Sequence, residues 1–371
     1  DMQVQNMEVQ EAGDQLSSCS QLGGLVSIQM VLRAAIELNV FNIIADAGPD
    51  AYLSAADITS KIPTTDPNSA AYTLERILRF LGAYSILSIS RKPLGNNGEN
   101  ASHEWTYGLT KMSQCLVSSG TGGSTATSPA SIMIRISCER ELLESLLRIK
   151  DAVLEPGSAP FKKAHGVNFY EYLEKKPIYR QLFDEFMEVG EKLVFDDVFK
   201  VYGGFEDVRE LIDVGGGIGT TSAKIISLNP HVRGLNFDLP QVIADAPALP
   251  GVKHAAGDMF ESIPNAQTIL LKRILHNWDD ERCKRLLRNC WEALPADGKV
   301  IVVEMAIPQE LENNLETMNV LKEDLYMMLL MAGGKERTLA EFDHLAKAVG
   351  FTKMKVFPMP HGSVHVIELY K

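Results

Sequence analysis

The sequence is poor in cysteine and has no basic excess, and both shortages narrow the class of protein. Its 371 residues include five cysteines, an odd number without a CxxC pair, so we expect no disulfide framework. The net charge of −12 disfavours nucleic acid as a partner, because phosphate binding needs a basic face. A neutral or cationic small molecule fits this charge better.

Long apolar runs are also lacking. No stretch of about 18 apolar residues is present, so no segment is predicted to span a membrane. Residues 1–21 are polar and lack the apolar core of a signal peptide. Scattered thiols are typical of a reducing compartment, and we predict a cytoplasmic protein. Cys283 and Cys290 lie seven residues apart on one face of a predicted helix, where we expect buried core thiols.

The chain is long enough for two domains, since single cores stop growing near ~250–300 residues. We predict a flexible tail over 1–20 and a mainly helical, winged-helix domain over 21–128, with polar residues 91–103 as the tip of its hairpin. This domain is apolar rather than basic, which favours dimerisation over DNA binding. Its predicted helices and strands cover residues 22–44, 54–62, 71–81, 84–90 and 105–109.

Residues 129–371 are predicted to form a second, α/β domain with a Rossmann-like, mainly parallel sheet. The Ser/Gly/Thr-rich residues 114–128 are interpreted as the linker that precedes it, and residues 132–153 and 169–202 as helical. Beyond them, short β-rich runs alternate with helical runs, which is typical of βαβ units. The predicted strands are 211–214, 234–238, 268–275 and 299–306, and the predicted helices are 221–228, 279–294 and 339–349.

The strongest local motif covers Glu210–Gly219, where an apolar strand leads into the glycine turn Gly215-Gly216-Gly217 and then a helix. Glycines allow a ligand to approach the backbone closely. A bare Gly-x-Gly-x-Gly also suits dinucleotides. Asp213 changes the balance, because a nicotinamide fingerprint normally has an apolar residue there. An acid in this turn suits a ligand with an ammonium group, such as the amino-acid end of S-adenosylmethionine.

Two further acids follow successive predicted strands. Asp238 ends the second strand, where a carboxylate can bind both hydroxyls of a ribose. Asp258 follows the next strand and precedes Met259 and Phe260, so it can accept from an adenine amino group while the apolar pair covers the ring. Each acid alone is more typical of a strand-end turn. Their common place at the carboxyl edge of one sheet predicts a cofactor site.

His276 is the candidate base, because it follows strand 268–275 on the same edge. Glu304 is predicted to end the next strand, and Glu336 lies in Gly333–Thr338, after a Met-rich helix. Carboxylates beside a histidine hold one tautomer and stabilise its cation. A lone histidine at a strand end is structural more often than catalytic, so the two acids carry this hypothesis.

Methyl transfer to a phenol explains why a base is needed. A phenol has a pKa of ~10 and is mostly protonated at neutral pH, whereas an imidazole near ~6.5–7 can take its proton. The remaining task is to hold oxygen, methyl and sulfur in line. No metal is required, and no His/Cys/carboxylate cluster shows ligand spacing in the sequence.

These motifs together resemble the plant caffeic acid-type (class II) small-molecule O-methyltransferases. The similarity extends throughout residues 201–371 and is looser before them. Several segments look closer to the scoulerine 9-O-methyltransferases of benzylisoquinoline alkaloid biosynthesis, among them Leu32–Phe41, Gly82–Ser88 and Asn289–Trp291. The motifs are Asp-Val-Gly-Gly-Gly-x-Gly, Asn-Phe-Asp-Leu-Pro, Gly-Asp-Met-Phe, Leu-His-x-Trp-Asp-Asp and Gly-Gly-Lys-Glu-Arg-Thr.

The resemblance implies an intertwined homodimer, S-adenosylmethionine as cofactor, no metal, and substrate-binding helices over 131–200. It implies that His276 is the base, bracketed by Glu304 and Glu336. The implied cofactor-binding positions are Gly215, Asp238, Leu239, Asp258, Met259 and Lys272. The implied substrate-binding positions are Ile136, Leu142, Phe169, Leu173, Tyr179, Phe183, Met187, Asp324, Tyr326, Met327 and Met331.

Two departures from the family refine the expected chemistry. Asn277 stands where the family usually has Asp, which removes a charge near the imidazole. Leu173, Gly190 and Met331 stand where the caffeic acid enzymes have polar or His residues. A more apolar pocket favours a bulky polycycle over a hydroxycinnamate, although a stripe of methionines is by itself more typical of a core.

We therefore expect O-methylation of a phenolic hydroxyl on a scoulerine-like tetrahydroprotoberberine or a benzylisoquinoline alkaloid. The alternatives are a flavonoid, coumarin or phenylpropanoid substrate, and N-methylation on the same scaffold. A nicotinamide-dependent reductase would share the sheet but not Asp213 or the acids about His276. A non-catalytic dimeric binding protein would be expected to lose His276.

Overall fold

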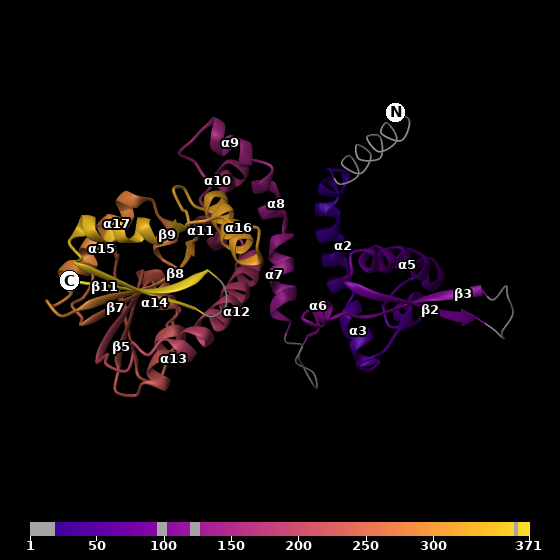
Figure 1. Ribbon diagram of the computed structural model, residues 1–371, viewed down its shortest axis with the longest axis horizontal. Helices are drawn as coiled ribbons and strands as arrows, with labels where there is room; N and C mark the ends of the chain where they lie inside the picture. The colour runs from indigo at the N-terminus through magenta and orange to yellow at the C-terminus, as the bar shows by residue number, and fades with distance from the viewer. Residues whose placement is uncertain (1–18, 95–101, 119–126, 360–362) are drawn as a thin grey trace, which may run out of the picture. The chain divides into compact units, whose positions relative to one another are not determined.

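The structure is a computed structural model that describes residues 19–94, 102–118, 127–359 and 363–371 (Figure 1). The chain divides into two compact units, one formed by residues 1–143 with 181–187, the other by 144–180 with 188–371. Most of the predicted tail, 1–20, lies outside the described residues, and so does the middle of the predicted linker. Residues 19 and 20, the end of that tail, are helical.

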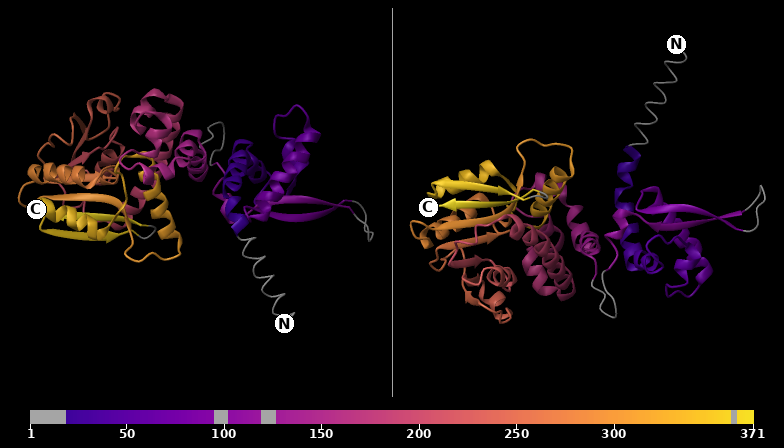
Figure 2. Two further views of the ribbon diagram at one scale, coloured as in Figure 1. Left: turned by 90° about the horizontal axis from the view of Figure 1, so that it is seen from above. Right: turned by 60° about the horizontal axis from the view of Figure 1, so that its bottom comes forward.

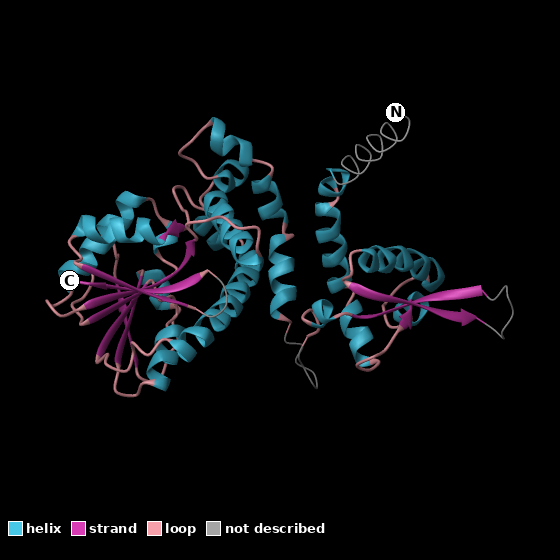
Figure 3. Ribbon diagram, in the orientation of Figure 1, coloured by secondary structure: helices cyan, strands magenta, loops and turns pink. Residues whose placement is uncertain are grey.

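The first unit combines helices with a small antiparallel sheet of order β1-β3-β2 (Figure 3). The helices predicted over 22–44 are α2 and α3, which are separated where Asn39 takes a left-handed conformation with φ of 60°. The predicted hairpin tip is shorter than expected, because both strands continue into it. The elements are α2 (Leu25–Glu37), α3 (Val40–Asp46), β1 (Leu53–Ser54), α4 (Ala55–Thr59), α5 (Pro67–Ala83), β2 (Leu87–Leu94), β3 (Ser102–Leu109), α6 (Lys111–Gln114) and α7 (Pro129–Ser137).

The first unit extends beyond the boundary predicted at residue 128, because α7 and the residues after it pack on α2. Arg33 donates to the carbonyl of Cys138 at 2.5 Å and pairs with Glu139 at 3.1 Å. Gln29 donates to the hydroxyl of Ser137 at 3.0 Å. These polar contacts supplement an apolar core of α2 to α5 and β3, so the first part of the predicted substrate-binding region belongs to this unit.

No single helix in the described part of the chain is long and apolar enough to cross a membrane. The pair α2 and α3 has the length and composition when taken together, but it is bent by 53°. The apolar side chains of α3, including Phe41 and Ile44, are buried in the core of the first unit.

The second unit is built on a twisted sheet of order β10-β11-β8-β7-β4-β5-β6 (Figure 1). The strands from β8 to β6 are parallel, and β11 and β10 are antiparallel additions at one edge. The strand order reverses beside β4, and ligands bind at such a switch point. The strands are β4 (Glu210–Val214), β5 (Arg233–Asp238), β6 (Val252–Ala256), β7 (Thr268–Lys272), β8 (Lys299–Ile307), β10 (Lys353–Pro358) and β11 (Val364–Tyr370), with β9 (Arg337–Thr338) beside the end of β8.

Helices lie on both faces of this sheet, as the two views of Figure 2 show. Alternate residues of β7 and β8 enter different cores: Ile269 and Val300 pack with α15 and α17, whereas Leu270 and Ile301 pack with α13 and α12. This two-sided burial explains why the central strands are apolar throughout. The helices that follow α7 along the chain are α8 (Arg140–Leu146), α9 (Ile149–Leu154), α10 (Pro160–His165), α11 (Phe169–Lys175), α12 (Pro177–Val201), α13 (Thr220–Leu228), α14 (Pro240–Ala244), α15 (Asp280–Ala293), α16 (Leu315–Leu330) and α17 (Leu339–Val349); parts of α8 and α12 belong to the first unit.

The two ranges predicted to be helical before the sheet each contain more than one helix. Residues 132–153 form α7, α8 and α9, and residues 169–202 form α11 and α12, which meet at Lys176. Pro177 begins α12, and a proline disfavours helical conformation in the residue before it. The predicted fold class, a Rossmann-like α/β sheet with an N-terminal helical domain, is confirmed.

Cys283 and Cys290 are confirmed as core thiols, since both side chains are fully buried in α15 and unbonded to another cysteine. Burial raises the pKa of Cys283 to about 12 and raises that of Cys290 further still. Neither thiol forms a reactive thiolate at neutral pH.

A buried ionic cluster ties β11 to the rest of the second unit. Glu368 accepts from Tyr202 at 2.7 Å and from Tyr370 at 2.5 Å, and it pairs with Lys299. Burial alone would raise the pKa of Glu368, but the hydrogen bonds from Lys299 and the tyrosines outweigh it and lower the pKa below its usual range. The cluster is therefore most stabilising with Glu368 ionised.

We expect Glu368→Gln to lower the free energy of unfolding at pH 7 by about 3 kcal/mol, because it leaves the Lys299 ammonium unpaired in the interior. A carboxylate with a lowered folded-state pKa contributes stability above its unfolded pKa and loses it as the pH falls. The difference between variant and wild type should therefore narrow from pH 6 to pH 3 in urea unfolding. The exposed Glu281→Gln is the control, with an expected change under ~1 kcal/mol. A pH-independent difference would contradict the ionic role.

Candidate active site

The glycine turn after β4 is shaped for close approach of a ligand. Gly215 and Gly217 have φ of 69° and 60°, values that residues other than glycine rarely adopt. A Cβ on Gly216 would lie 2.2 Å from Oδ1 of Asn236, whereas one on Gly217 would meet nothing within 4 Å. The turn therefore rests on the protein at one glycine and is open at the next.

Asp238 lies at the end of β5 and faces this turn. Its Oδ2 accepts from the backbone N–H of Gly217 at 2.8 Å, and its Oδ1 accepts from that of Leu239 at 2.7 Å. Burial raises the pKa of Asp238, and these two hydrogen bonds oppose the rise. Each carboxylate oxygen keeps a lone pair for a further donor, so the group can bind two hydroxyls.

Asp258 and Met259 follow β6 on the same edge. Oδ1 of Asp258 accepts from the N–H of Phe260 at 2.8 Å, which fixes a short turn, and Asn289 donates to the carbonyl of Met259 at 2.8 Å. The ring of Phe260 meets that of Trp278 edge to face, with centroids 4.9 Å apart. Asp258 and Leu239 are exposed, so both are available to a ligand.

Lys272, the last residue of β7, is buried and donates to the hydroxyl of Thr221 in the first turn of α13 at 2.9 Å. Asp213 is also buried and accepts from Ser222 at 3.0 Å. Both charged groups lie where the strands β4 and β7 meet the start of α13. The structure thus brings the predicted cofactor residues to one edge of the sheet.

The sequence predicted that His276 directly follows a strand, but the structure places it in a separate turn. β7 stops at Lys272, Arg273 takes a left-handed φ of 52°, and residues Leu275–Asn277 form a 3₁₀ turn. Asn277 stabilises this turn by donating its side-chain amide to the carbonyl of Arg273 at 3.1 Å. An aspartate in that position has no N–H to donate, so Asn277 has a local structural reason beside its lack of charge.

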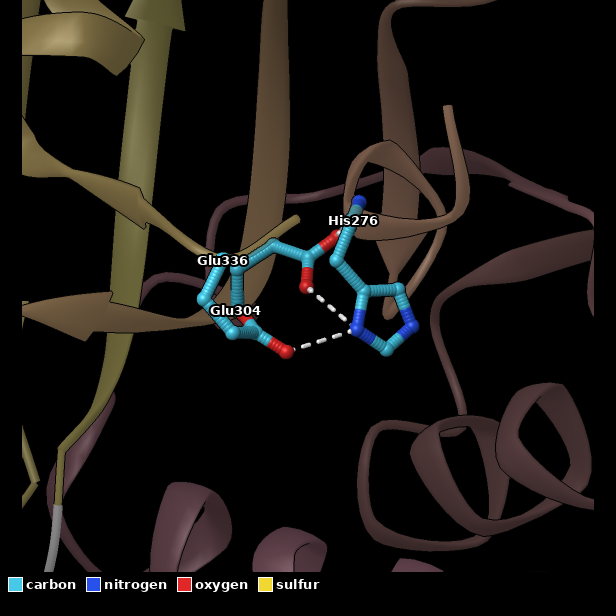
Figure 4. A group of neighbouring side chains, drawn as sticks. All are labelled: His276, Glu304 and Glu336. Atoms are coloured by element: carbon cyan, nitrogen blue, oxygen red, sulfur yellow. Dashed lines mark hydrogen bonds and ion pairs between the residues drawn. The ribbon is translucent and has the colours of Figure 1, made fainter. Parts of the chain in front are cut away.

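Both glutamates approach one nitrogen of His276, and they do not bracket the ring. Nδ1 lies 2.9 Å from Oε1 of Glu336 and 3.9 Å from Oε2 of Glu304, whereas Nε2 points away from both (Figure 4). Glu304 lies inside β8 and not at its end. Its Oε1 accepts from the N–H of Leu275 at 2.8 Å and, more weakly, from that of His276 at 3.4 Å. Glu304 thus holds the turn, and Glu336 orients the ring.

All three side chains are buried, with exposed fractions of 5% for His276, 1% for Glu304 and 2% for Glu336. Burial raises the pKa of Glu304; the His276 charge opposes this and Glu336 adds to it. When Glu336 is ionised it accepts from Nδ1–H, so Nε2 carries the lone pair. In that tautomer the imidazole can accept a proton at Nε2.

The three groups also lie close enough to surround a cation, since their ligand atoms are within 4.8 Å of one another. The sequence predicted these three residues together as a base with two carboxylates, and not as metal ligands. A metal on Nδ1 would displace its hydrogen and with it the 2.9 Å hydrogen bond to Glu336. The geometry favours an orienting hydrogen bond over a metal centre.

The predicted substrate-binding residues are divided between the two units. Tyr326 and Met327 lie on α16, and Met331 follows it. Asp324, also on α16, accepts from the backbone N–H of Glu336 at 2.9 Å, so at least part of its role is to support that residue. Burial raises the pKa of Asp324. In the second unit lie Phe169, Leu173, Tyr179, Asp324, Tyr326, Met327 and Met331, and in the first lie Ile136, Leu142, Phe183 and Met187.

Sequence reasoning missed three residues near the site. Asn236, buried in β5, donates to the carbonyl of Gly217 at 2.8 Å, and a lone amide in an apolar strand is a signal for such a role. Tyr170 on α11 is half-exposed as a whole, but burial of its hydroxyl raises its pKa to about 12, with the Asp238 charge adding to the shift. Arg337 is fully buried directly after Glu336.

Comparison with known proteins shows the family of the chain. Residues 147–352 match the model of the O-methyltransferase domain, and residues 21–119 match that of the O-methyltransferase dimerisation domain. The chain belongs to the O-methyltransferase family. It is a homodimeric methyltransferase of the class that uses S-adenosylmethionine.

The chain is similar along its whole length to curated plant enzymes. It is 50% identical to (S)-scoulerine 9-O-methyltransferase of Coptis japonica, over 99% of this chain and 92% of that one. It is 44% identical to myricetin 3'-O-methyltransferase 4 of Solanum lycopersicum, over 93% and 92%. Human N-acetylserotonin methyltransferase, solved in complex with SAM, shares the fold at 21% identity with a TM-score of 0.73, over 96% of this chain and 97% of that one.

Proposed function

We propose that this protein methylates a phenolic hydroxyl of a tetrahydroprotoberberine of the scoulerine type, or of a benzylisoquinoline alkaloid, in the cytoplasm. The observation that carries the phenol is the buried histidine whose Nδ1 is held by Glu336 at 2.9 Å and whose Nε2 is turned away from both carboxylates. The 50% identity to a scoulerine 9-O-methyltransferase supports the alkaloid. Five unbonded cysteines support a reducing compartment.

The residues at the carboxyl edge of the sheet fit S-adenosylmethionine. The open face of Gly217 accommodates a ligand against the backbone, Asp238 has lone pairs for two ribose hydroxyls, and Asp258 is exposed for an adenine amino group. We assign cofactor binding to Gly215, Asp238, Leu239, Asp258, Met259 and Lys272. When bound there, S-adenosylmethionine supplies an electrophilic methyl group on a positively charged sulfur.

His276 performs the proton transfer in this proposal. Nε2 accepts the phenolic proton, which leaves the oxygen with the anionic character that in-line displacement requires. The charge that appears on the ring is stabilised by Glu336 through Nδ1–H. Glu304 keeps the 3₁₀ turn against β8, so the imidazole stays aimed while the substrate binds. The remaining rate enhancement comes from alignment of the reacting atoms.

The substrate class rests on the apolar character of the proposed pocket. Leu173 and Met331 are positions where a caffeic acid enzyme would offer polar groups, and their apolar side chains favour a polycyclic ring system. The 44% identity to a myricetin methyltransferase makes a flavonoid the second candidate. We assign the domain functions by the same family pattern: dimerisation to residues 21–128, and cofactor binding and catalysis to 129–371.

A substrate panel tests this proposal. With S-adenosylmethionine present, scoulerine or another phenolic tetrahydroprotoberberine should be methylated with kcat/KM at least ~10-fold above myricetin and caffeic acid, because apolar surface burial favours the larger ring system. Product structure read by NMR identifies the methylated atom. Preference for a flavonoid would reject the alkaloid, and a methylated nitrogen would reject the phenol.

The cofactor is tested separately. S-adenosylhomocysteine should raise the thermal unfolding temperature, while NAD at the same concentration should leave it unchanged, because only a ligand of the native state stabilises it. Stabilisation by NAD instead would indicate a reductase on the same sheet.

A further inference from the structure

The 3₁₀ turn that carries His276 is held by a second segment of the chain, residues 334–338. The backbone N–H of Lys335 donates to the carbonyl of His276 at 2.9 Å. The guanidinium of Arg337 donates to the carbonyl of Leu275 at 2.9 Å and to that of Trp278 at 2.7 Å. Three carbonyls of the turn, at residues 275, 276 and 278, thus accept from Lys335 and Arg337, the two residues on either side of Glu336.

The position of Arg337 is unusual for a charged residue. Its side chain has no exposed surface, and a buried cation is costly unless it is paired and fully hydrogen-bonded. Its counter-ion is Asp280 at the start of α15, whose Oδ1 accepts from Nε at 3.1 Å and from Nη2 at 2.8 Å. The guanidinium therefore joins the turn, the helix that follows it and the strand β9.

Arg337 is also the residue next to Glu336, which orients the imidazole. β9 pairs Arg337 with Ala306 of β8, two residues beyond Glu304. The backbone of Arg337 is therefore paired with the strand that carries Glu304, while its guanidinium holds the turn that carries His276. A lysine could not do the same, because an ammonium on a flexible stem lacks the planar fork that serves two carbonyls and a carboxylate at once.

We infer that Arg337 is a positioning residue for the reaction, whose guanidinium sets the place of His276 relative to Glu336. The inference rests on the proposed role of His276 as the base. It assigns to Arg337 no contact with substrate or cofactor. Its effect on turnover passes through the geometry of the Nδ1–H hydrogen bond.

The test compares Arg337→Lys with Arg285→Lys, the same substitution at an exposed position of α15. Arg337→Lys should lower kcat at least ~10-fold, because small misplacement of a reacting group costs rate. The Kd for S-adenosylhomocysteine should stay within ~2-fold, because the cofactor edge is untouched. Arg285→Lys should leave both unchanged. The substrate is any phenolic tetrahydroprotoberberine that the wild type methylates.

A spectroscopic readout separates positioning from a general loss of fold. In protein labelled with ¹⁵N-histidine and without substrate, the Nδ1–H proton held by Glu336 should give a downfield resonance. That resonance should be lost or moved in Arg337→Lys and kept in Arg285→Lys. Added guanidinium should restore part of the turnover of Arg337→Ala; if this variant does not fold, Arg337→Lys decides alone. Unchanged kcat with an unchanged resonance would overturn the inference.

The resonance also distinguishes this inference from the proposed function. If it is lost in Arg337→Lys while His276→Ala retains turnover, the guanidinium positions the ring but the ring is not the base. If kcat falls in Arg337→Lys with the resonance unchanged, positioning of His276 is rejected.

Discussion

His276→Ala should lower turnover by ~10² or more while the affinity for S-adenosylhomocysteine stays unchanged, because a missing general base costs that factor. The proposed cofactor residues lie at or just after the ends of β4, β5, β6 and β7, and the partners of the imidazole are Glu336 and Glu304 instead, so binding is expected to survive. Turnover is measured with a phenolic alkaloid, and cofactor affinity by titration calorimetry.

The control for this variant is His344→Ala, an exposed histidine on α17. His344→Ala should keep the wild-type turnover and the wild-type affinity for S-adenosylhomocysteine. That result would show that the loss of turnover is specific to the imidazole of His276. A thermal melt confirms that His276→Ala is folded despite the two carboxylates left facing each other. If folded His276→Ala retained its turnover, His276 would not be the base.

Glu336→Gln should lower turnover by ~10², whereas Glu304→Gln should lower it by less than ~10-fold. The reason is the different use of the two carboxylates. Glu336 accepts from Nδ1 at 2.9 Å and needs its charge to stabilise the imidazolium. Glu304 accepts mainly from the backbone of Leu275, which a glutamine oxygen can also do.

The raised pKa of Glu304 supports this asymmetry, because a carboxyl that burial pushes toward its neutral form loses less on replacement by a neutral amide. The two variants are isosteric and equally buried, so each serves as the other's control. Steady-state kcat at pH 7.5 is the measurement. An equal fall in kcat in both variants would mean that the two carboxylates act as a pair. Their different distances from Nδ1 of His276 would then not correspond to different roles.

Much of the second unit could be predicted from the sequence, because buried parallel strands are recognisable as short apolar runs. The strands β4, β5 and β8 match their predicted ranges to within a residue at either end. The strand predicted over 268–275 was too long, because Ile274 and Leu275 are apolar for a different reason: they pack in the core around α15 and α17. Periodicity cannot separate a buried strand from a buried turn.

The residues of the site were predictable as types but not as geometry. Acids and a histidine at the ends of apolar runs indicated the sheet edge. That Glu304 and Glu336 share one nitrogen depends on the path of residues 331–338, which no local pattern records. Arg337 was missed for the same reason, since a lone arginine in a polar segment gives no sign that tertiary packing will bury it.

The points at which the helices end were also only partly predictable from local sequence. Pro177 could have signalled the end of α11, because proline restricts the residue before it. Asn39 was a weaker signal, since a left-handed asparagine is recognised only when its φ is seen. Local chemistry predicts where a chain is able to turn, and long-range packing decides whether it does.

The one-sided arrangement of the carboxylates has a consequence for the end of the catalytic cycle. In the proposed mechanism Nδ1 stays bonded to Glu336, so the proton that the ring takes from the phenol leaves from Nε2, on the side where the methylated product would lie. Product departure must then precede resetting of the base. In this mechanism the order of events is fixed: the product leaves first, and His276 loses its proton afterwards.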